Sequence, residues 1–400
     1  MGRTQPSLGL APPAQRKDAR AKAARLTAHK TIPALLTSSA RARKGVEGST
    51  LIVDSPIPGG EVGEKESGKQ GNNGDDHGDR VKVRIVVDDT LAVARAMSQT
   101  AEAGTDEGKS SSRPKRNVTV LNMASPLLPG GGFLNGATAQ EETLCNRTTL
   151  YPALRDEFYR LPEVGAIWTE DVMVFRDESG KDLSKRERWW VDVISAGMLR
   201  FPDVEREHEE QKYTSSKDRH TAIEKIRCVM EILKSKGVEK CVLGAWGCGA
   251  YGNPVPEIAR AFKKVILGEA KGRKTGKGVC WGSLKEVAFA IKDGKMALEF
   301  GKHFGVEVEI EKKPTFDEQE ETNEEEERAA ETLRHLEDKI RELDLRISRS
   351  KNPALKAPLE TIRADLEHQL ALKQSSATAN SDSLDEEDSE SQNEDGTESE

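Results

Sequence analysis

The 400-residue chain has few cysteines, few aromatic residues and no long hydrophobic run. Its five cysteines contain no CxxC pair and show no metal-ligand spacing with histidine, so the sequence predicts no metal site. An odd number of cysteines without a secretory signal is typical of a reducing compartment. No apolar run approaches the roughly 20 residues of a membrane-spanning helix, so we expect no membrane span.

Hydrophobic residues are also scarce, at 35% of the chain, whereas charged residues make up 32%. Several stretches are therefore too polar to bury a core that would offset the entropy lost on ordering. A chain of 400 residues could form two or three average domains, but this composition favours one sizeable globular domain with tails.

The net charge of −8 is distributed unevenly. Basic side chains dominate the first 50 residues, and the last 25 carry acidic but no basic side chains. Runs of one sign are usually solvated, disordered tails. A nucleic-acid-binding arm at the front and a partner-binding tail at the back are the alternatives.

Beyond about residue 314 the pattern changes. Leucine and isoleucine recur at spacings of three and four, as in Leu333, Leu336 and Ile340, which predicts a helical hairpin or short coiled coil. The predicted organisation is a disordered basic N-terminus at 1–15, a globular domain at 16–313 with polar inserts at 59–80, 99–116 and 268–278, the helical region at 314–373, and a disordered acidic tail at 374–400.

Within the globular domain, apolar runs alternate with helical patterns. Such alternation predicts an α/β sandwich with a mixed or mostly parallel sheet. A first helix is expected over 16–37, kinked or ended by Pro33. The expected strands are 81–87, 118–123, 190–196, 240–246 and 286–291, and the further helices are 88–97, 140–160, 220–236 and 255–267.

The most informative stretch is NMASPLLPGGGFLNGATAQEE, residues 122–142. A strand ends near Asn122, and three glycines, Gly130, Gly131 and Gly132, let the backbone approach a ligand closely because they lack Cβ atoms. A helix then begins near Gln140. Acidic residues in a first turn are favoured by the helix dipole, so Glu141 and Glu142 could be simple N-terminal caps.

The glycines argue for more than capping. A strand, a glycine loop and a helix start form a site where backbone amides can bind an anion. Two carboxylates at the edge of this site indicate acid–base chemistry on a phosphate-bearing ligand. The loop matches neither GxxxxGK[ST] nor GxGxxG, which disfavours a Walker NTPase or a dinucleotide-binding loop.

A second glycine cluster, GAWGCGAYGN at 244–253, also lies between an apolar run and a helix start. Its amides could hold a diphosphate, and Tyr251 could pack against a sugar or base. Taken alone, a tight structural turn is as good an interpretation. Cys248 could be a nucleophile, although an inert small residue in the loop is the favoured interpretation.

Together, PGGGFLNGATAQEETLC and LGAWGCGAYGNP resemble the two ligand loops of microbial-type poly(ADP-ribose) glycohydrolases, in the same order and at similar spacing. The resemblance covers about residues 18–310; it is strong at the two loops and diffuse elsewhere. It implies a macrodomain-like three-layer α/β sandwich that binds ADP-ribose at the strand ends. The polar inserts, the helical region and the acidic tail lie outside the family pattern.

The resemblance also implies roles for single residues. Glu142 would be the catalytic acid and base, Glu141 would hold ribose hydroxyls, and Gln140 would orient the pair. The first diphosphate loop would contain Gly130, Gly131, Gly132 and Phe133, and the second would contain Gly247, Cys248, Gly249 and Ala250. Tyr251 would pack near the distal ribose, and Asn122 and Asn135 would contact ribose.

The implied activity is hydrolysis of the ribose–ribose bonds of poly(ADP-ribose), with no cofactor and no metal. The alternatives are a non-catalytic ADP-ribose-binding macrodomain, a mono-ADP-ribosyl hydrolase, and an interaction scaffold built on the helical region. Expected partners are poly(ADP-ribose) or ADP-ribosylated proteins, and a protein bound through 314–373. The charge pattern weakly indicates a nuclear or cytoplasmic location.

Overall fold

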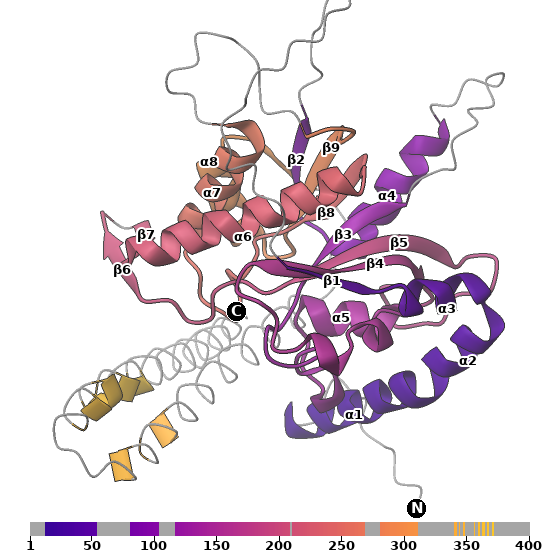
Figure 1. The fold of residues 1–400 in the computed structure, drawn as a ribbon, viewed down its shortest axis with the longest axis horizontal. Coiled ribbons are helices and arrows are strands. Elements are labelled where there is room, and N and C mark those ends of the chain that lie inside the picture. The colour runs from indigo at the N-terminus through magenta and orange to yellow at the C-terminus, as the bar shows by residue number, and fades with distance from the viewer. Residues whose placement is uncertain are drawn as a thin grey trace, which may run out of the picture. The chain divides into compact units, whose positions relative to one another are not determined.

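A mixed sheet of eight strands organises the protein, as its computed structural model shows (Figure 1). The structure describes residues 13–53, 81–103, 117–208, 210–268 and 281–310, with single positions between 340 and 371. The strands run in the order β1 (Thr50–Val53), β4 (Gly165–Val174), β5 (Trp189–Ala196), β3 (Val118–Met123), β8 (Lys240–Leu243), β9 (Glu286–Ala290), β2 (Lys82–Val86) and β10 (Val308–Glu309).

The sheet is antiparallel at one side and parallel elsewhere. Strand β4 pairs antiparallel with β1 and β5, and every pairing from β5 to β10 is parallel. Strands β3 and β8 are parallel neighbours, so their carboxyl ends, at Met123 and Leu243, lie at the same edge. Each of the two glycine loops leaves the sheet from one of these ends.

Helices cover both faces of the sheet. The segment α1 (Pro13–Leu26) is joined to α2 (Ile32–Ser38) by a π-helical turn (Thr27–Thr31), followed by α3 (Ala40–Glu47). The remaining helices are α4 (Thr90–Ala103), α5 (Gln140–Arg147), α6 (Ser216–Ser235), α7 (Val255–Leu267) and α8 (Gly294–Phe304), and a hairpin of β6 (Val204–Glu207) and β7 (Glu210–Tyr213) precedes α6.

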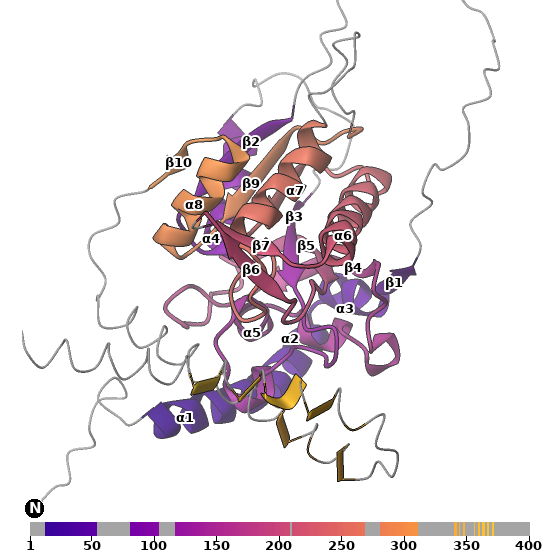
Figure 2. The ribbon, with the colours of Figure 1, turned by 90° about the vertical axis from the view of Figure 1, so that its left-hand side faces the viewer.

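Alternate strand residues enter two separate cores. Leu121, Cys241 and Leu243 pack with α6, α7 and α8, which lie side by side over one face (Figure 2). Val120 and Val242, one position away, pack with α1, α4 and α5 over the other face. This is the period-two alternation of strands buried on both sides. The expected macrodomain-like three-layer sandwich with a mixed sheet is therefore confirmed.

Most predicted elements lie where the sequence placed them, with two corrections. The helix expected over 140–160 was wrong beyond Arg147, because Thr148 forms a β-bridge with Val174 and the chain continues in short 3-10 turns. The expected helix over 16–37 is interrupted before Pro33, by the π-helical turn Thr27–Thr31.

Residues 313–400 form a separate compact unit. Its described positions between 340 and 371 are helical, and Leu366 packs with Ile340, Leu359 and Leu370. Arg363 lies 3.1 Å from Asp344, an ion pair between positions 19 residues apart. The helical hairpin, the coiled coil and the acidic tail stay predictions, since much of 314–373 and all of 374–400 lie outside the described residues.

Candidate active site

The first turn of α5 is attached to strand β3 by the Gln140 side chain. Its Oε1 accepts a hydrogen bond of 2.9 Å from the Met123 amide, and its Nε2 donates one of 2.7 Å to the Leu121 carbonyl. Both partners belong to the end of β3, so the helix begins at a fixed position beside the strand. Gln140 thereby positions the two glutamates that follow it.

Glu141 is buried and fully engaged by its surroundings. Its Oε2 accepts 2.7 Å from the Ser125 amide, and its Oε1 accepts 3.3 Å from Asn122 Nδ2. Burial raises the pKa of Glu141 from 4.5 to about 8, and the charge of Glu142 adds to the increase. At neutral pH the site therefore holds a protonated carboxyl directly beside Glu142.

Glu142 faces the glycine loop. Its Oε1 accepts a hydrogen bond of 2.7 Å from the Gly132 amide. A Cβ atom built on Gly131 would lie 2.7 Å from Glu142 Oε1 and 2.9 Å from Glu141 Oε2, and Gly131 has a φ of +55°. Two carboxylates thus converge on one residue that only glycine can occupy without strain. This convergence is the geometry that the predicted acid–base pair requires.

The other amides of the first loop are also engaged. The Gly131 amide donates to the Leu128 carbonyl at 3.1 Å, and the Gly130 backbone hydrogen-bonds to Glu141. Gly130 lies under the Tyr151 ring, since a Cβ built there would come within 2.9 Å of Tyr151 Cδ2. In this structure the loop therefore holds the two glutamates, and its predicted role in binding a diphosphate stays a prediction.

The second loop is more open. The Cys248 amide donates to the Ala245 carbonyl at 3.0 Å, whereas the amides of Gly249 and Ala250 donate to no other residue that the structure describes. Both residues are exposed, and nothing lies within 4 Å of a Cβ built on Gly249. Backbone amides that point to solvent from a glycine turn suit an anion.

The structure brings the two loops together. The Trp246 indole donates 3.1 Å to the carbonyl of Ala196, at the end of β5. The Tyr251 side chain interacts with Ser125, whose amide holds Glu141. The second loop therefore borders the carboxylate pair.

Three predicted residues occupy different surroundings from the rest. Phe133 is buried in the core against Tyr151, with ring centroids 5.2 Å apart, so only its backbone faces the loop. Asn135 is exposed. Burial raises the pKa of the Cys248 thiol, which keeps it protonated and argues against the nucleophile alternative.

Several residues of the site were not predicted from the sequence. Ser125 and Ser195 support the buried acids, since Asn122 Nδ2 donates to Ser195 Oγ at 3.1 Å. Asn122 Oδ1 and the Tyr159 hydroxyl are buried without a hydrogen-bond partner among the described residues. Burial raises the pKa of Tyr159, with a contribution from the charge of Glu141. A lone serine or tyrosine gives no local pattern that sequence reasoning could have used.

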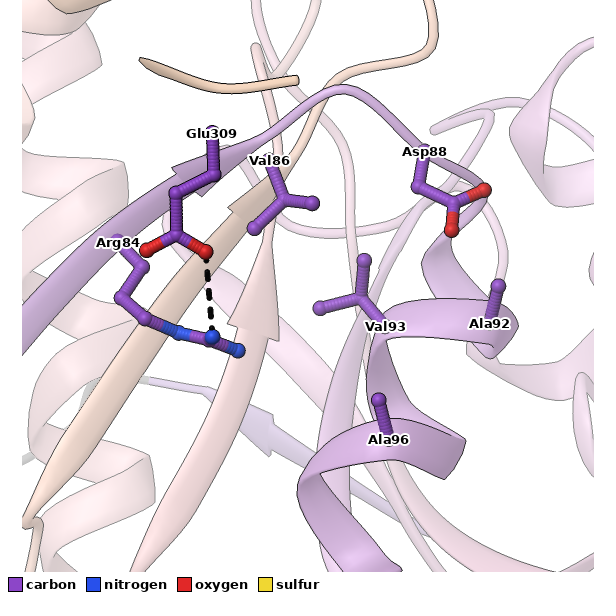
Figure 3. Close-up of a pocket in the computed structure, with 7 residues that line it drawn as sticks. All are labelled: Arg84, Val86, Asp88, Ala92, Val93, Ala96 and Glu309. Atoms are coloured by element: carbon purple, nitrogen blue, oxygen red, sulfur yellow. Dashed lines mark hydrogen bonds and ion pairs between the residues drawn. The ribbon is translucent and has the colours of Figure 1, made fainter. Parts of the chain in front are cut away.

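A cavity of 110 Å³ lies elsewhere, between β2 and α4 (Figure 3). Arg84 and Glu309 line one side and form an ion pair of 3.2 Å, while Asp88 and small apolar side chains of α4 line the other. None of the predicted site residues contributes to this cavity.

The described residues contain no helix that is long and apolar enough to cross a membrane. They also contain no cluster of three or more histidine, cysteine, aspartate or glutamate side chains arranged to hold a metal ion.

Comparison with solved structures finds two bacterial poly(ADP-ribose) glycohydrolases. The enzyme of Thermomonospora curvata is 22% identical, with a TM-score of 0.49, over 72% of this chain and 100% of that one. The enzyme of Deinococcus radiodurans, solved in complex with ADP-ribose, is 24% identical, with a TM-score of 0.43, over 56% of this chain and 84% of that one. Comparison with curated proteins gave no match.

Comparison with protein families gives a match at the first loop. Residues 55–177 match the family described as "Microbial-type PARG, catalytic domain". This stretch contains the triple glycine, Gln140 and the two glutamates. The resemblance predicted from the sequence is confirmed: residues 55–177 carry the pattern of the microbial-type PARG catalytic domain.

Proposed function

We propose that the protein hydrolyses the ribose–ribose O-glycosidic bonds of poly(ADP-ribose) and releases ADP-ribose. The proposal is supported by the family match over residues 55–177. The observation that carries it is the convergence of Glu141 and Glu142 on Gly131, at 2.9 and 2.7 Å from the position of an added Cβ. A carboxyl group fixed at a loop in this way is placed to act as a general acid and base on a glycosidic bond.

In the proposed reaction Glu142 is the general acid and then the general base. Its carboxyl group donates a proton to the leaving ribose oxygen while the bond between that oxygen and the anomeric carbon breaks. The bonding electron pair leaves with the oxygen, and positive charge develops at the anomeric carbon. A water molecule then attacks this carbon and gives its proton to the Glu142 carboxylate, which restores the starting state. Such catalysis is typically worth about 10²–10⁴-fold.

Glu141 would bind the ribose next to the broken bond. With a pKa of about 8 it is neutral at pH 7, so its carboxyl group can donate one hydrogen bond and accept others. A neutral neighbour also avoids a second full negative charge beside the substrate's phosphates. The open amides of Gly249 and Ala250 would meet the diphosphate, because glycine-rich backbone favours anions.

The decisive experiment is Glu142→Gln, assayed on purified poly(ADP-ribose) for release of ADP-ribose. We expect kcat/KM to fall by about 100-fold or more, since glutamine cannot donate and recover the proton. ADP-ribose binding, measured by calorimetry, should be retained. The matched control is Glu239→Gln, because Glu239 precedes β8 at the opposite end of the strand and pairs with Lys285 at 3.0 Å.

The assay also separates the proposed function from its alternatives. A wild-type protein that binds ADP-ribose but never releases it from polymer would be a reader without catalysis. Release from mono-ADP-ribosylated protein but not from polymer would indicate a mono-ADP-ribosyl hydrolase. Full activity of Glu142→Gln would show that Glu142 is not the general acid and base.

Location and protein partners are part of the same proposal. We infer a nuclear or cytoplasmic location from the charge pattern and a partner that binds through residues 314–373. Fluorescence microscopy of the tagged full chain would test the first. Pull-down with the full chain and with a chain ending at residue 312 would test the second, since the two units are separately compact.

A further inference from the structure

One basic residue is built into the border of the site. The Arg200 guanidinium lies 5.6 Å from the ring centroid of Phe201 and 5.6 Å from that of Tyr251. The two rings meet edge to face at 6.0 Å, and the Phe201 amide donates 3.0 Å to the Tyr251 carbonyl. The loop after β5 and the second glycine loop are thereby joined, with the guanidinium within cation–π distance of both rings.

The backbone of this cluster is strained. Phe201 has a φ of +50°, which is uncommon for a bulky residue and costs free energy. Such strain persists only where surrounding contacts enforce it, and it concentrates at ligand sites. Here the hydrogen bond to Tyr251 and the edge-to-face contact of the two rings enforce it, and the result is a fixed position for Arg200.

Within the part of the chain that the structure describes, no acidic side chain neutralises the charge of Arg200. Arg200 is half-buried and forms no ion pair with any residue that the structure describes. A cation–π contact uses none of the N–H groups of a guanidinium as a hydrogen-bond donor, and these groups match phosphate in a two-pronged arrangement. A cation of this kind is suited to bind an anion that arrives from solution.

We propose that Arg200 forms a second anion subsite, which binds a phosphate of the neighbouring ADP-ribose unit, on the far side of the bond that is cut. This inference rests on the proposed function. The open amides of Gly249 and Ala250 are available for the diphosphate of the bound unit. Arg200 lies 5.6 Å from the centre of the Tyr251 ring, and the Tyr251 side chain interacts with Ser125 beside Glu141, so Tyr251 links Arg200 to the acids.

The subsite would bind poly(ADP-ribose) but not free ADP-ribose. Free ADP-ribose fills only the bound unit, whereas poly(ADP-ribose) continues past the scissile bond and carries a further diphosphate. Arg200 therefore contributes to the affinity for polymer and not to the affinity for ADP-ribose. Because the contact is the same in ground and transition states, it affects KM and leaves kcat unchanged.

The test compares Arg200→Gln with wild-type full-length protein. We expect KM for poly(ADP-ribose) to rise by about tenfold, the usual effect of losing one hydrogen bond to a charged group. The dissociation constant for ADP-ribose and kcat should stay unchanged. Added salt should raise KM for wild type more steeply than for the variant, since screening weakens an ionic contact. Arg200→Lys, which keeps the charge, should recover part of the affinity.

Arg95→Gln is the matched control. Arg95 stacks on Trp189 at 5.7 Å, at the opposite end of strand β5, so this variant loses the same charge and the same kind of ring contact. It should leave KM for polymer unchanged. Melting temperatures of both variants show whether either substitution acts through the fold alone.

Each of the other outcomes contradicts either the Arg200 subsite or the proposed function on which it rests. A wild type that does not cleave polymer refutes the proposed function itself. If wild type cleaves polymer and Arg200→Gln has the same KM, the subsite does not exist. If Arg200→Gln also loses affinity for ADP-ribose, the guanidinium binds the first unit and not the second. If Arg95→Gln raises KM equally, general charge and not position is responsible.

Discussion

Replacing Glu141 by glutamine should make the protein more stable at alkaline pH. Glu141 has a pKa raised from 4.5 to about 8, chiefly because burial disfavours its charged form. Between these two values the folded protein holds a proton that the unfolded chain has released. The folded state binds more protons there, so the free energy of unfolding falls as pH rises. Glutamine stays neutral at every pH and removes this dependence.

The size of this effect on the free energy of unfolding follows from the difference between the pKa of Glu141 in the unfolded chain and in the folded protein. At about 1.4 kcal/mol per pH unit, the interval from 4.5 to about 8 corresponds to at most about 5 kcal/mol. The stabilising contribution is complete below pH 4.5 and is lost by about pH 8. For a domain whose total stability is typically about 5–15 kcal/mol, this is a large fraction. At pH 5 both proteins hold a neutral side chain at this position, and the stability of the variant relative to the wild type should rise by several kcal/mol between pH 5 and pH 9.

Denaturant unfolding at pH steps between 5 and 9 measures this directly, with the midpoint and slope recorded at each pH. The control is Glu239→Gln, which removes an exposed carboxylate. Its curve should run parallel to that of the wild type. If Glu141→Gln also runs parallel to the wild type over this range, Glu141 is not protonated in the folded protein and the assignment of the proton is refuted.

Two further predictions test the surroundings of the pair. Gly131→Ala should lower activity by about 100-fold, because its methyl group would lie 2.7 Å from Glu142 Oε1 and 2.9 Å from Glu141 Oε2 and would displace both carboxyl groups. Gly249→Ala should keep the wild-type melting temperature, because no atom lies within 4 Å of its added methyl group. Arg147→Ala should lower the free energy of unfolding by about 3 kcal/mol, because it leaves Asp89, now 2.7 Å away, without its buried cation; denaturant titration measures the loss, and an unchanged midpoint would contradict it.

The elements that the sequence predicted best are those with one clear period. Strand β3 and helix α7 have the predicted bounds, 118–123 and 255–267. Strand β3 is mostly apolar because both its faces are buried, and α7 places its apolar residues on one face at helical spacing. Where a local pattern and the tertiary packing agree, the pattern suffices.

The prediction failed where tertiary partners override a local period. Residues 148–160 continue an apolar spacing of about 3.6, but Thr149 Oγ1 accepts 3.0 Å from the Met173 amide and its own amide donates to the Met173 carbonyl. Strand β4, which supplies these partners, was itself not predicted. The chain leaves the helix to pair with a strand, Thr149 with Met173, 24 residues away, and no local rule contains that information.

The residues of the site also divide into those that a local sequence pattern identifies and those that only the fold reveals. The glycines, Gln140 and the two glutamates form a continuous motif, so they could be identified together. Arg200 belongs to no motif, and it reaches the site only because β5 ends beside β3 in the parallel part of the sheet. A residue whose role depends on the strand order becomes visible only with the fold.

The two glycine loops show why similar sequence signals lead to different chemistry. Each follows a buried strand and precedes a helix, yet the Gly132 amide binds Glu142, while the amides of Gly249 and Ala250 remain open. The difference lies in the helix that follows. Helix α5 begins with long side chains that turn back to the loop, whereas the first-turn acid of α7, Glu257, pairs with Arg219 at 2.7 Å. An anion can therefore meet free amides at the second loop and acids at the first, an arrangement that would keep the phosphates of the proposed substrate apart from the carboxyl group proposed to break its bond.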